Sequence, residues 1–365
     1  MIDPTDCLRS AATVSASLRA RVAVFAATPA PPRYLLGRNA DAAHMLTQLP
    51  HISFDGVVDD YAAAGTTWHG LPLVRGADFD AGAVVIHCAT SISPLSAHRM
   101  LAQRGATIIG YAELCRCYPQ LSLPRFVAET RADVAANPER WHDLASALAD
   151  QTSRTLLDQL LTFRLSGDYT GMEGCSVCFG EQYFDAVVQV GPETVFVDCG
   201  GFDGDTSAEF IRRYPRFSRI WLFEPSQRNF ASAQRRLGHL ASVTLVPLGV
   251  SDRAETLCFD DVSGSASTIS GAGATRIDVV PIDSYIDTPV SFIKMDLEGW
   301  EMRALAGAAQ HIRNDHPTLA IAVYHHPADF WKVHRFVTGI RNDYTIYLRH
   351  YSEGWSETVM YFIPR

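Results

Sequence analysis

The feature that most constrains the fold is an apolar run that passes directly into a glycine-rich loop, VFVDCGGFDGDT at 195–206. Its first residues have the composition of a buried strand that ends at Asp198, and a helix is expected to begin near Thr206. The glycines between them let the backbone pass close to a ligand, and the helix N-terminus offers unpaired N–H groups. The pattern predicts a nucleotide-like ligand at the carboxyl edge of a parallel sheet, with a purely structural turn as the alternative.

Runs of strand character alternate with helical or looped segments in the N-terminal part of the chain. Such alternation is typical of β-α-β units and predicts a small Rossmann-like α/β domain over residues 1–123. A helix is expected over 95–105. The predicted strands are 21–26, 34–37, 54–59, 83–88 and 107–110.

Residues 124–179 are predicted to form a helical connector, because leucines recur there at helical spacing and Asn137-Pro138 supplies a helix start. A second strand series follows, with runs at 194–198, 219–224, 243–248, 277–280, 292–295 and 319–324. The last two runs, 344–349 and 358–363, are joined by SEGWSE and predict an antiparallel pair. Residues 180–365 are therefore expected to form an α/β domain with a seven-stranded, mostly parallel sheet and an antiparallel last strand.

A second acidic residue, at the end of the next predicted strand, further supports a nucleotide-like ligand. The run RIWLFEP places Glu224 at the end of the neighbouring strand, where a carboxylate can accept hydrogen bonds from both hydroxyls of a ribose. A dinucleotide enzyme shares this acid but normally has G-x-G-x-x-G without an acid before the first glycine. Asp198 occupies that place here, and its carboxylate suits a cofactor that carries an ammonium group and a sulfonium.

These motifs, in this order, resemble the FkbM-type methyltransferases, which belong to the Rossmann-like S-adenosylmethionine-dependent enzymes. The resemblance covers the C-terminal half of the chain, and residues 33–75 resemble a small Rossmann-like domain of sugar-modifying enzymes. The segments that carry the first resemblance are EQYFD (181–185), FVDCGGFDGDT, WLFEPSQRN, LGVSD (248–252), KMDLEGWE (294–301) and LRHYS with ETVMY.

The resemblance implies S-adenosylmethionine as the cofactor and a set of residues around it. Gln182 and Tyr183 would cover its methionine side, although simple core packing is the alternative for Tyr183. Glu224 and the adjacent Pro225 would hold the ribose. The loop would contribute Asp198, Gly200, Gly201, Asp203, Gly204 and Thr206, and Val250, Ser251 and Asp252 would approach the adenine.

Polar residues that follow two further strands are the candidates for removing a proton from the acceptor. His325 or His326 is the expected general base, with a capped loop histidine as the alternative. Asp296 with His325 and one of two glutamates could instead hold a divalent cation, unless those glutamates only cap the following helix. The candidates are Lys294, Asp296, Glu298, Glu301, His325 and His326.

The resemblance favours O-methylation of a sugar, nucleotide sugar or secondary metabolite, with N-methylation left open. The alternatives are a regulatory or scaffold protein without turnover and an NAD-dependent nucleotide-sugar oxidoreductase. The N-terminal domain has only Gly37 where a glycine cluster is usual, so presenting substrate or forming a homodimer is at least as good an expectation for it as nucleotide binding.

Composition narrows the partners and the compartment. A formal net charge of -9 argues against a protein that binds nucleic acid or anionic membranes. No apolar run approaches the roughly 18 residues that span a bilayer, and the eight cysteines are too sparse for a disulfide scaffold, so a cytoplasmic protein is expected. Cys115, Cys117, Cys175 and Cys178 leave a zinc site as a minor alternative.

Overall fold

The computed structural model describes residues 13–63, 65–80, 82–260, 268–269 and 275–365. The chain divides into two compact units. Unit 1 comprises 1–138, 155–177 and 351–357, and unit 2 comprises 139–154, 178–350 and 358–365. This division differs from the three segments expected from the sequence, because the helical connector is shared between the units. Within the described part of the chain, no helix is long and apolar enough to cross a membrane.

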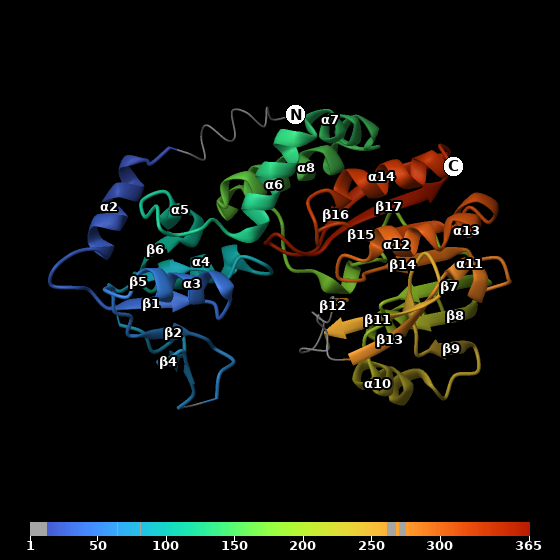
Figure 1. Ribbon diagram of the computed structural model, residues 1–365, viewed down its shortest axis with the longest axis horizontal. Coiled ribbons are helices and arrows are strands. Elements are labelled where there is room, and N and C mark those ends of the chain that lie inside the picture. Colours follow the sequence, from blue (N-terminus) through green and yellow to red (C-terminus); the bar gives the residue numbers. More distant parts are fainter. Residues whose placement is uncertain (1–12, 64, 81, 261–267, 270–274) are drawn as a thin grey trace. The chain divides into compact units, whose positions relative to one another are not determined.

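Unit 1 is built on a six-stranded sheet of order β3-β4-β2-β1-β5-β6 (Figure 1). Adjacent strands of this sheet run parallel to each other, except for the short strands β3 and β4, which are antiparallel. The strands are β1 Arg33–Leu36, β2 Gly56–Val58, β3 Thr67–Trp68, β4 Leu71–Val74, β5 Val84–His87 and β6 Thr107–Gly110. The helices are α2 Ala16–Phe25, α3 Ala40–Gln48, α4 Pro94–Gln103, α5 Tyr111–Cys115 and α6 Arg125–Ala136, with the 3-10 turn η1 Tyr169–Met172.

One predicted strand, 21–26, is wrong, because this run is the second half of helix α2. Ser15 caps the helix by accepting a hydrogen bond from the Leu18 backbone N–H. Leu18 and Phe25 lie seven residues apart, two helical turns, and both are fully buried. The valines gave the run its strand character, but the buried pair and the cap follow the helical period.

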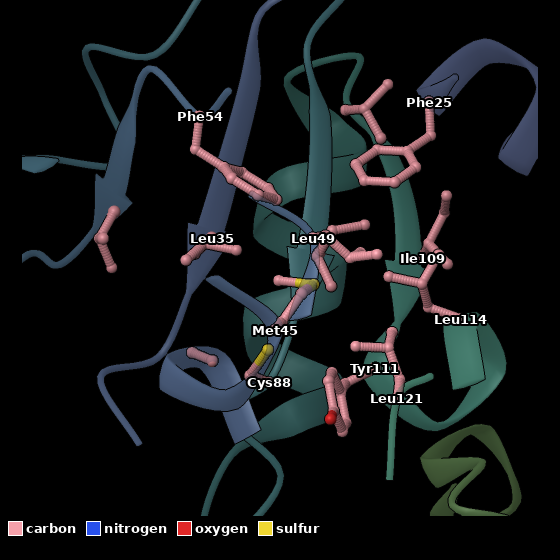
Figure 2. Packing of buried hydrophobic residues seen from close by; sticks show 14 of the residues in the cluster. Phe25, Leu35, Met45, Leu49, Phe54, Cys88, Ile109, Tyr111, Leu114 and Leu121 are labelled. Carbon is pink, nitrogen blue, oxygen red and sulfur yellow. The ribbon is translucent and has the colours of Figure 1, made fainter. Parts of the chain in front are cut away.

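The core of unit 1 joins the sheet to helices that are distant in the sequence. Figure 2 shows Phe25 from α2, Met45 from α3 and Leu114 from α5 gathered with residues of the sheet strands. The rings of Phe25 and Phe54 lie 6.2 Å apart. Burial of these side chains on one face holds α2 against the sheet.

Unit 2 contains the predicted seven-stranded sheet, with order β16-β17-β15-β14-β7-β8-β9 (Figure 1). Strands β9, β8, β7, β14 and β15 are parallel, and β17 is antiparallel to both β15 and β16. The antiparallel closing pair is thereby confirmed. The strands are β7 Thr194–Cys199, β8 Phe217–Phe223, β9 Val243–Val246, β14 Phe292–Met295, β15 Thr318–Ala322, β16 Tyr344–His350 and β17 Thr358–Pro364.

The predicted strand at 277–280 exists, but it does not belong to this sheet. It is part of β13 Thr275–Val280 in a four-stranded sheet of order β10-β13-β11-β12. Alternate residues of β13 are buried, as in a strand with one covered face. The other strands of this sheet are β10 Gly249–Val250, β11 Glu255–Asp260 and β12 Thr268–Ile269.

Helices complete unit 2 and connect its parallel strands. α12 and α13 each pack on α14 (Figure 1). α9 packs on α10. The helices are α9 Asp205–Arg213, α10 Gln227–Leu237, α11 Ile282–Tyr285, α12 Glu301–Ala306, α13 Ala309–Asn314 and α14 Asp329–Ile340, with the 3-10 turn η2 Phe179–Glu181. The connector helices α7 Pro138–Ala147 and α8 Gln151–Ser166 have residues in both units.

An aromatic cluster fixes α9 on the sheet of unit 2. Phe210 of α9 is fully buried and stacks on Phe196 of β7, with ring centroids 4.5 Å apart. Phe184 and Phe292 complete the cluster. The helix that follows the glycine-rich loop is therefore anchored by its inward face.

Phe210→Ala is expected to lower the free energy of unfolding by about 3 to 5 kcal/mol, because it leaves a cavity among packed rings. Urea denaturation followed by circular dichroism measures this change. Phe179→Ala is the matched control, since Phe179 is 48% exposed and should change stability little. Equal stability of the two variants would contradict the anchoring role of Phe210.

Candidate functional site

The candidate site lies at the carboxyl ends of four neighbouring parallel strands of unit 2. In the register of the sheet, Asp198 of β7 is level with Lys294 of β14 and with Leu222 of β8. The segments that leave β7, β8, β14 and β15 therefore start at the same edge. Ligands of open α/β sheets bind at this edge.

The start of the glycine-rich loop passes so close to the ends of β14 and β8 that Gly200 and Gly201 have no room for a side chain. Gly200 has φ +77°, and a Cβ there would lie 2.0 Å from the carbonyl oxygen of Asp296. A Cβ on Gly201 would meet the Leu222 side chain at 2.3 Å. Gly204, with φ +86°, is the N-cap of α9. The sequence analysis expected these glycines to let the backbone approach a ligand, and the close contacts that they make in the structure are with the ends of the neighbouring strands.

Glu224 follows β8 and points back to the loop. Its Oε2 accepts a hydrogen bond from the Phe202 backbone N–H at 2.9 Å, and its Oε1 accepts one from the Ser226 N–H at 2.8 Å. Each carboxylate oxygen has a further lone pair for a ribose hydroxyl. Burial raises the pKa of Glu224 to about 7. Glu224 can therefore accept further hydrogen bonds from a ligand at the edge of the loop.

Asp198 and Lys294 form a buried ion pair beneath the loop. The Lys294 Nζ lies 3.0 Å from Asp198 Oδ1, off the direction of a hydrogen bond, and donates to the Gly200 carbonyl at 2.7 Å. Ser207 donates to Asp198 Oδ2 at 2.7 Å. Burial alone would lower the pKa of Lys294, but Asp198 and Asp296 outweigh it and raise the pKa. Lys294 is thus a charged group that holds the loop, and Asp198 is fully buried.

The other predicted cofactor residues lie around the same edge. Asp203 pairs with Arg236, and the Thr206 N–H donates to Asp205 at the start of α9. Ser251 donates to Asp252, whose carboxylate also accepts from Arg303. Val250 is buried in β10. Pro225 directly follows Glu224 and lies beside Gly249. A Cβ atom added to Gly249 would be 3.7 Å from the Cβ of Pro225.

Gln182 and Tyr183 come to the end of β14 from far away in the sequence. Tyr183 has φ +69°, and its hydroxyl donates to Asp296 Oδ2 at 2.5 Å. Gln182 donates to the same hydroxyl at 3.2 Å. Tyr324, which the sequence analysis did not single out, donates to Asp296 Oδ1 at 3.5 Å. Asp296 is therefore fixed by two tyrosines at the edge of the loop.

His325 lies among three carboxylates and is 8% exposed at its side chain. Its Nε2 lies 3.5 Å from Asp296 Oδ1 and 3.4 Å from Glu298 Oε2, and its Nδ1 lies 3.0 Å from Glu301 Oε1. Burial opposes a charge on the imidazole, but Glu301, Glu298 and Asp296 outweigh it and raise the pKa of His325 well above its usual value. We call these four residues the acidic cluster.

The neighbouring histidine has a different environment. His326 is exposed, its backbone N–H donates to Asp329, and its ring covers Gly299. Asp329 is buried, and burial together with Glu301 raises its pKa to about 7. Of the two predicted histidines, the structure brings only His325 into contact with Asp296. Among the described residues, the group suited to a metal is Asp296, Glu301 and His325, and it includes no cysteine.

Comparison with known proteins identifies the family of the C-terminal half of the chain. Residues 198–351 match the methyltransferase FkbM domain. A crystal structure of the methyltransferase FkbM from Methylobacillus flagellatus KT is similar over 99% of this chain and 100% of its own, with TM-score 0.74 and 26% identity. No curated protein matches the chain.

Two other solved structures overlap only in part. A putative rRNA methylase from Clostridium thermocellum has 15% identity and TM-score 0.33, covering 48% of this chain and 88% of its own. Aeropyrum pernix fibrillarin with natively bound S-adenosyl-L-methionine has 13% identity and TM-score 0.32, covering 48% and 69%. The assignment rests on the FkbM matches: the C-terminal half of the chain is an FkbM methyltransferase domain whose cofactor is S-adenosylmethionine.

Proposed function

We propose that this protein transfers a methyl group from S-adenosylmethionine to a hydroxyl group of a sugar or a hydroxylated secondary metabolite. The observation that carries the proposal is the acidic cluster, which stands next to the cofactor loop at the ends of β14 and β15. Carboxylates, tyrosine hydroxyls and an amide are the groups that recognise the hydroxyls of such acceptors. Asp296, Tyr183 and Gln182 supply them here.

The cofactor supplies an electrophilic methyl group, so the protein aligns the acceptor and removes its proton. In this proposal Glu224 holds the ribose, while Lys294 and Asp198 keep the loop in place beneath the cofactor. Asp296 orients the acceptor hydroxyl because the tyrosines Tyr183 and Tyr324 fix its carboxylate.

His325 is the candidate general base, because it is the predicted histidine that lies beside Asp296. Its raised pKa means that it keeps its own proton at neutral pH while three carboxylates surround it. A neutral imidazole, which a general base requires, appears there only when another positive charge compensates those carboxylates. The role of His325 therefore depends on what else occupies the acidic cluster.

The purified protein should transfer the label of methyl-labelled S-adenosylmethionine to hydroxylated acceptors and form one equivalent of S-adenosylhomocysteine. Mass spectrometry of sugar, nucleotide-sugar and polyol panels, with fragmentation to locate the methyl group, tests this proposal. Methyl groups found only on nitrogen would replace O-methylation with N-methylation. Calorimetric binding of NAD without S-adenosylhomocysteine would contradict the function as a whole.

Glu224→Ala should weaken binding of S-adenosylhomocysteine by about one to two decades. The lost charge-assisted hydrogen bonds are worth roughly 1.5 to 3 kcal/mol. Calorimetric titration measures the change. Glu193→Ala is the control, because Glu193 is exposed and lies at the opposite end of β7. An unchanged affinity in Glu224→Ala would remove the ribose assignment.

The affinity for S-adenosylhomocysteine should depend on pH through Glu224. With a pKa of about 7 in the free protein, the carboxyl is protonated at lower pH and ionised above it. The ionised form accepts both ribose hydroxyls, so affinity should rise with pH up to about 7 and then level off, by up to about tenfold per unit. Calorimetry between pH 5.5 and 8.5, at roughly half-unit steps, follows this change. Glu224→Gln should flatten the profile, and a wild-type slope retained in that variant would assign the dependence to another group.

A further inference from the structure

We propose that the acidic cluster binds a divalent cation of the Mn²⁺ or Mg²⁺ type, held by His325 and Asp296 and touching the acceptor hydroxyl. This inference rests on the proposed O-methylation and names what compensates the charge of the site.

The spacing of the donor atoms suits one ion. The Nε2 atom of His325 lies 3.5 Å from an oxygen of Asp296 and 3.4 Å from an oxygen of Glu298. Adjacent ligands of an octahedral ion with bonds of about 2.1 to 2.4 Å are about 3.0 to 3.4 Å apart. Asp296, Glu301 and His325 each offer a donor atom within 4.8 Å of the others. The group that meets this limit does not include Glu298, so the Glu298 side chain would have to turn to join Asp296 and His325 around one ion.

These close approaches are not hydrogen bonds. Both ring nitrogens of His325 are buried and have no partner in hydrogen-bond geometry, although carboxylate oxygens lie within 3.0 to 3.5 Å of them. The Oε2 atom of Glu301 is likewise buried without a hydrogen-bond partner, and Glu301 is fully buried. Buried polar atoms normally have partners. A cation between the side chains would satisfy Nε2 by direct coordination.

The excess of carboxylates around His325 also favours a bound cation. Three carboxylates face one imidazole, and a fourth, Asp329, is close enough for Glu301 to raise its pKa. The nearby ammonium group of Lys294 is already paired with Asp198. Even with a protonated His325, the carboxylates leave an excess of negative charge around a buried imidazole and the buried Glu301, although Asp296 and Glu298 are partly exposed. A divalent cation offsets that excess.

Glu301 directs His325 toward the proposed ion. Its Oε1 accepts from the Leu297 N–H at 2.7 Å, so the carboxylate is fixed, and it faces His325 Nδ1 at 3.0 Å. Metal-binding histidines commonly have a carboxylate at the ring nitrogen that does not bind the metal. Nε2 then remains free to face Asp296 and Glu298. Glu301 is a positioning residue in this arrangement.

A cation here would acidify the hydroxyl that it touches. During transfer the acceptor oxygen forms a bond to the methyl carbon, and the bond between that carbon and sulfur breaks. The electron pair stays on sulfur and yields neutral S-adenosylhomocysteine, while the hydroxyl proton passes to solvent. Two oxygens of a vicinal diol can reach one ion, so a vicinal diol is the acceptor class that this site favours.

The test is direct binding of Mn²⁺ to the full-length protein in the presence of S-adenosylhomocysteine, measured by electron paramagnetic resonance and calorimetry. We expect one Mn²⁺ per chain. His325→Gln and Asp296→Asn should each weaken binding at least tenfold. His239→Gln should leave it unchanged, because His239 is an exposed histidine after α10. Thermal unfolding of the wild type with and without Mn²⁺ gives a second readout, since binding to the folded state raises Tm.

Absence of Mn²⁺ binding by the wild type, or wild-type affinity for Mn²⁺ in both cluster variants, would overturn the proposal. The same measurements, combined with the methylation assay, distinguish failure of the cation proposal from failure of the proposed O-methylation. Hydroxyl methylation that persists in EDTA, without Mn²⁺ binding, would leave O-methylation standing and remove the cation. Specific Mn²⁺ binding without methylation of any hydroxyl would retain the cation and remove O-methylation.

Discussion

The buried pair of Asp198 and Lys294 is the interaction on which the candidate site depends. It joins the ends of two neighbouring strands, β7 and β14, and Lys294 adds a hydrogen bond to the carbonyl of Gly200. Removal of one partner from a buried pair costs about 3 to 5 kcal/mol, because a charge is then left alone in the interior. The same pair thus sets the path of the glycine-rich loop and the spacing of the strand ends around it.

Backbone conformation supports this arrangement at three points. Phe202, Tyr183 and Glu298 are non-glycine residues in the left-handed region, with φ of 47°, 69° and 52°. Such conformations persist where the surrounding structure imposes them, and they gather at functional sites. Here the first presents its N–H to Glu224, the second brings its hydroxyl to Asp296, and the third belongs to the acidic cluster. Three of the seven non-glycine positions with positive φ in the described chain therefore surround the place where, in our proposal, cofactor and acceptor meet.

The candidate site has two parts that differ in their balance of charged groups. At the loop, Lys294 balances Asp198, and Glu224 is left as a buried acceptor with a raised pKa. At the ends of β14 and β15, carboxylates outnumber cationic groups around His325. The first part suits a cofactor with hydroxyl groups and positive charge, and the second suits a positively charged companion to an acceptor hydroxyl. Two neighbouring strand ends therefore serve different chemical tasks.

The sequence by itself determined the class of fold, the FkbM methyltransferase domain and the edge of the sheet that carries the site. Periodicity and turn signals are local, so the loop after β7, the acid after β8 and the antiparallel closing pair could be predicted. Local signals failed at α2, where buried Leu18 and Phe25 outweigh the strand character of the valines, and at β13, which pairs in a separate sheet. Only the tertiary structure brought Tyr183, Tyr324 and Glu301 to Asp296 and His325. The physical reason is that sheet order and loop conformation decide which distant side chains meet, and no spacing along the chain encodes those contacts.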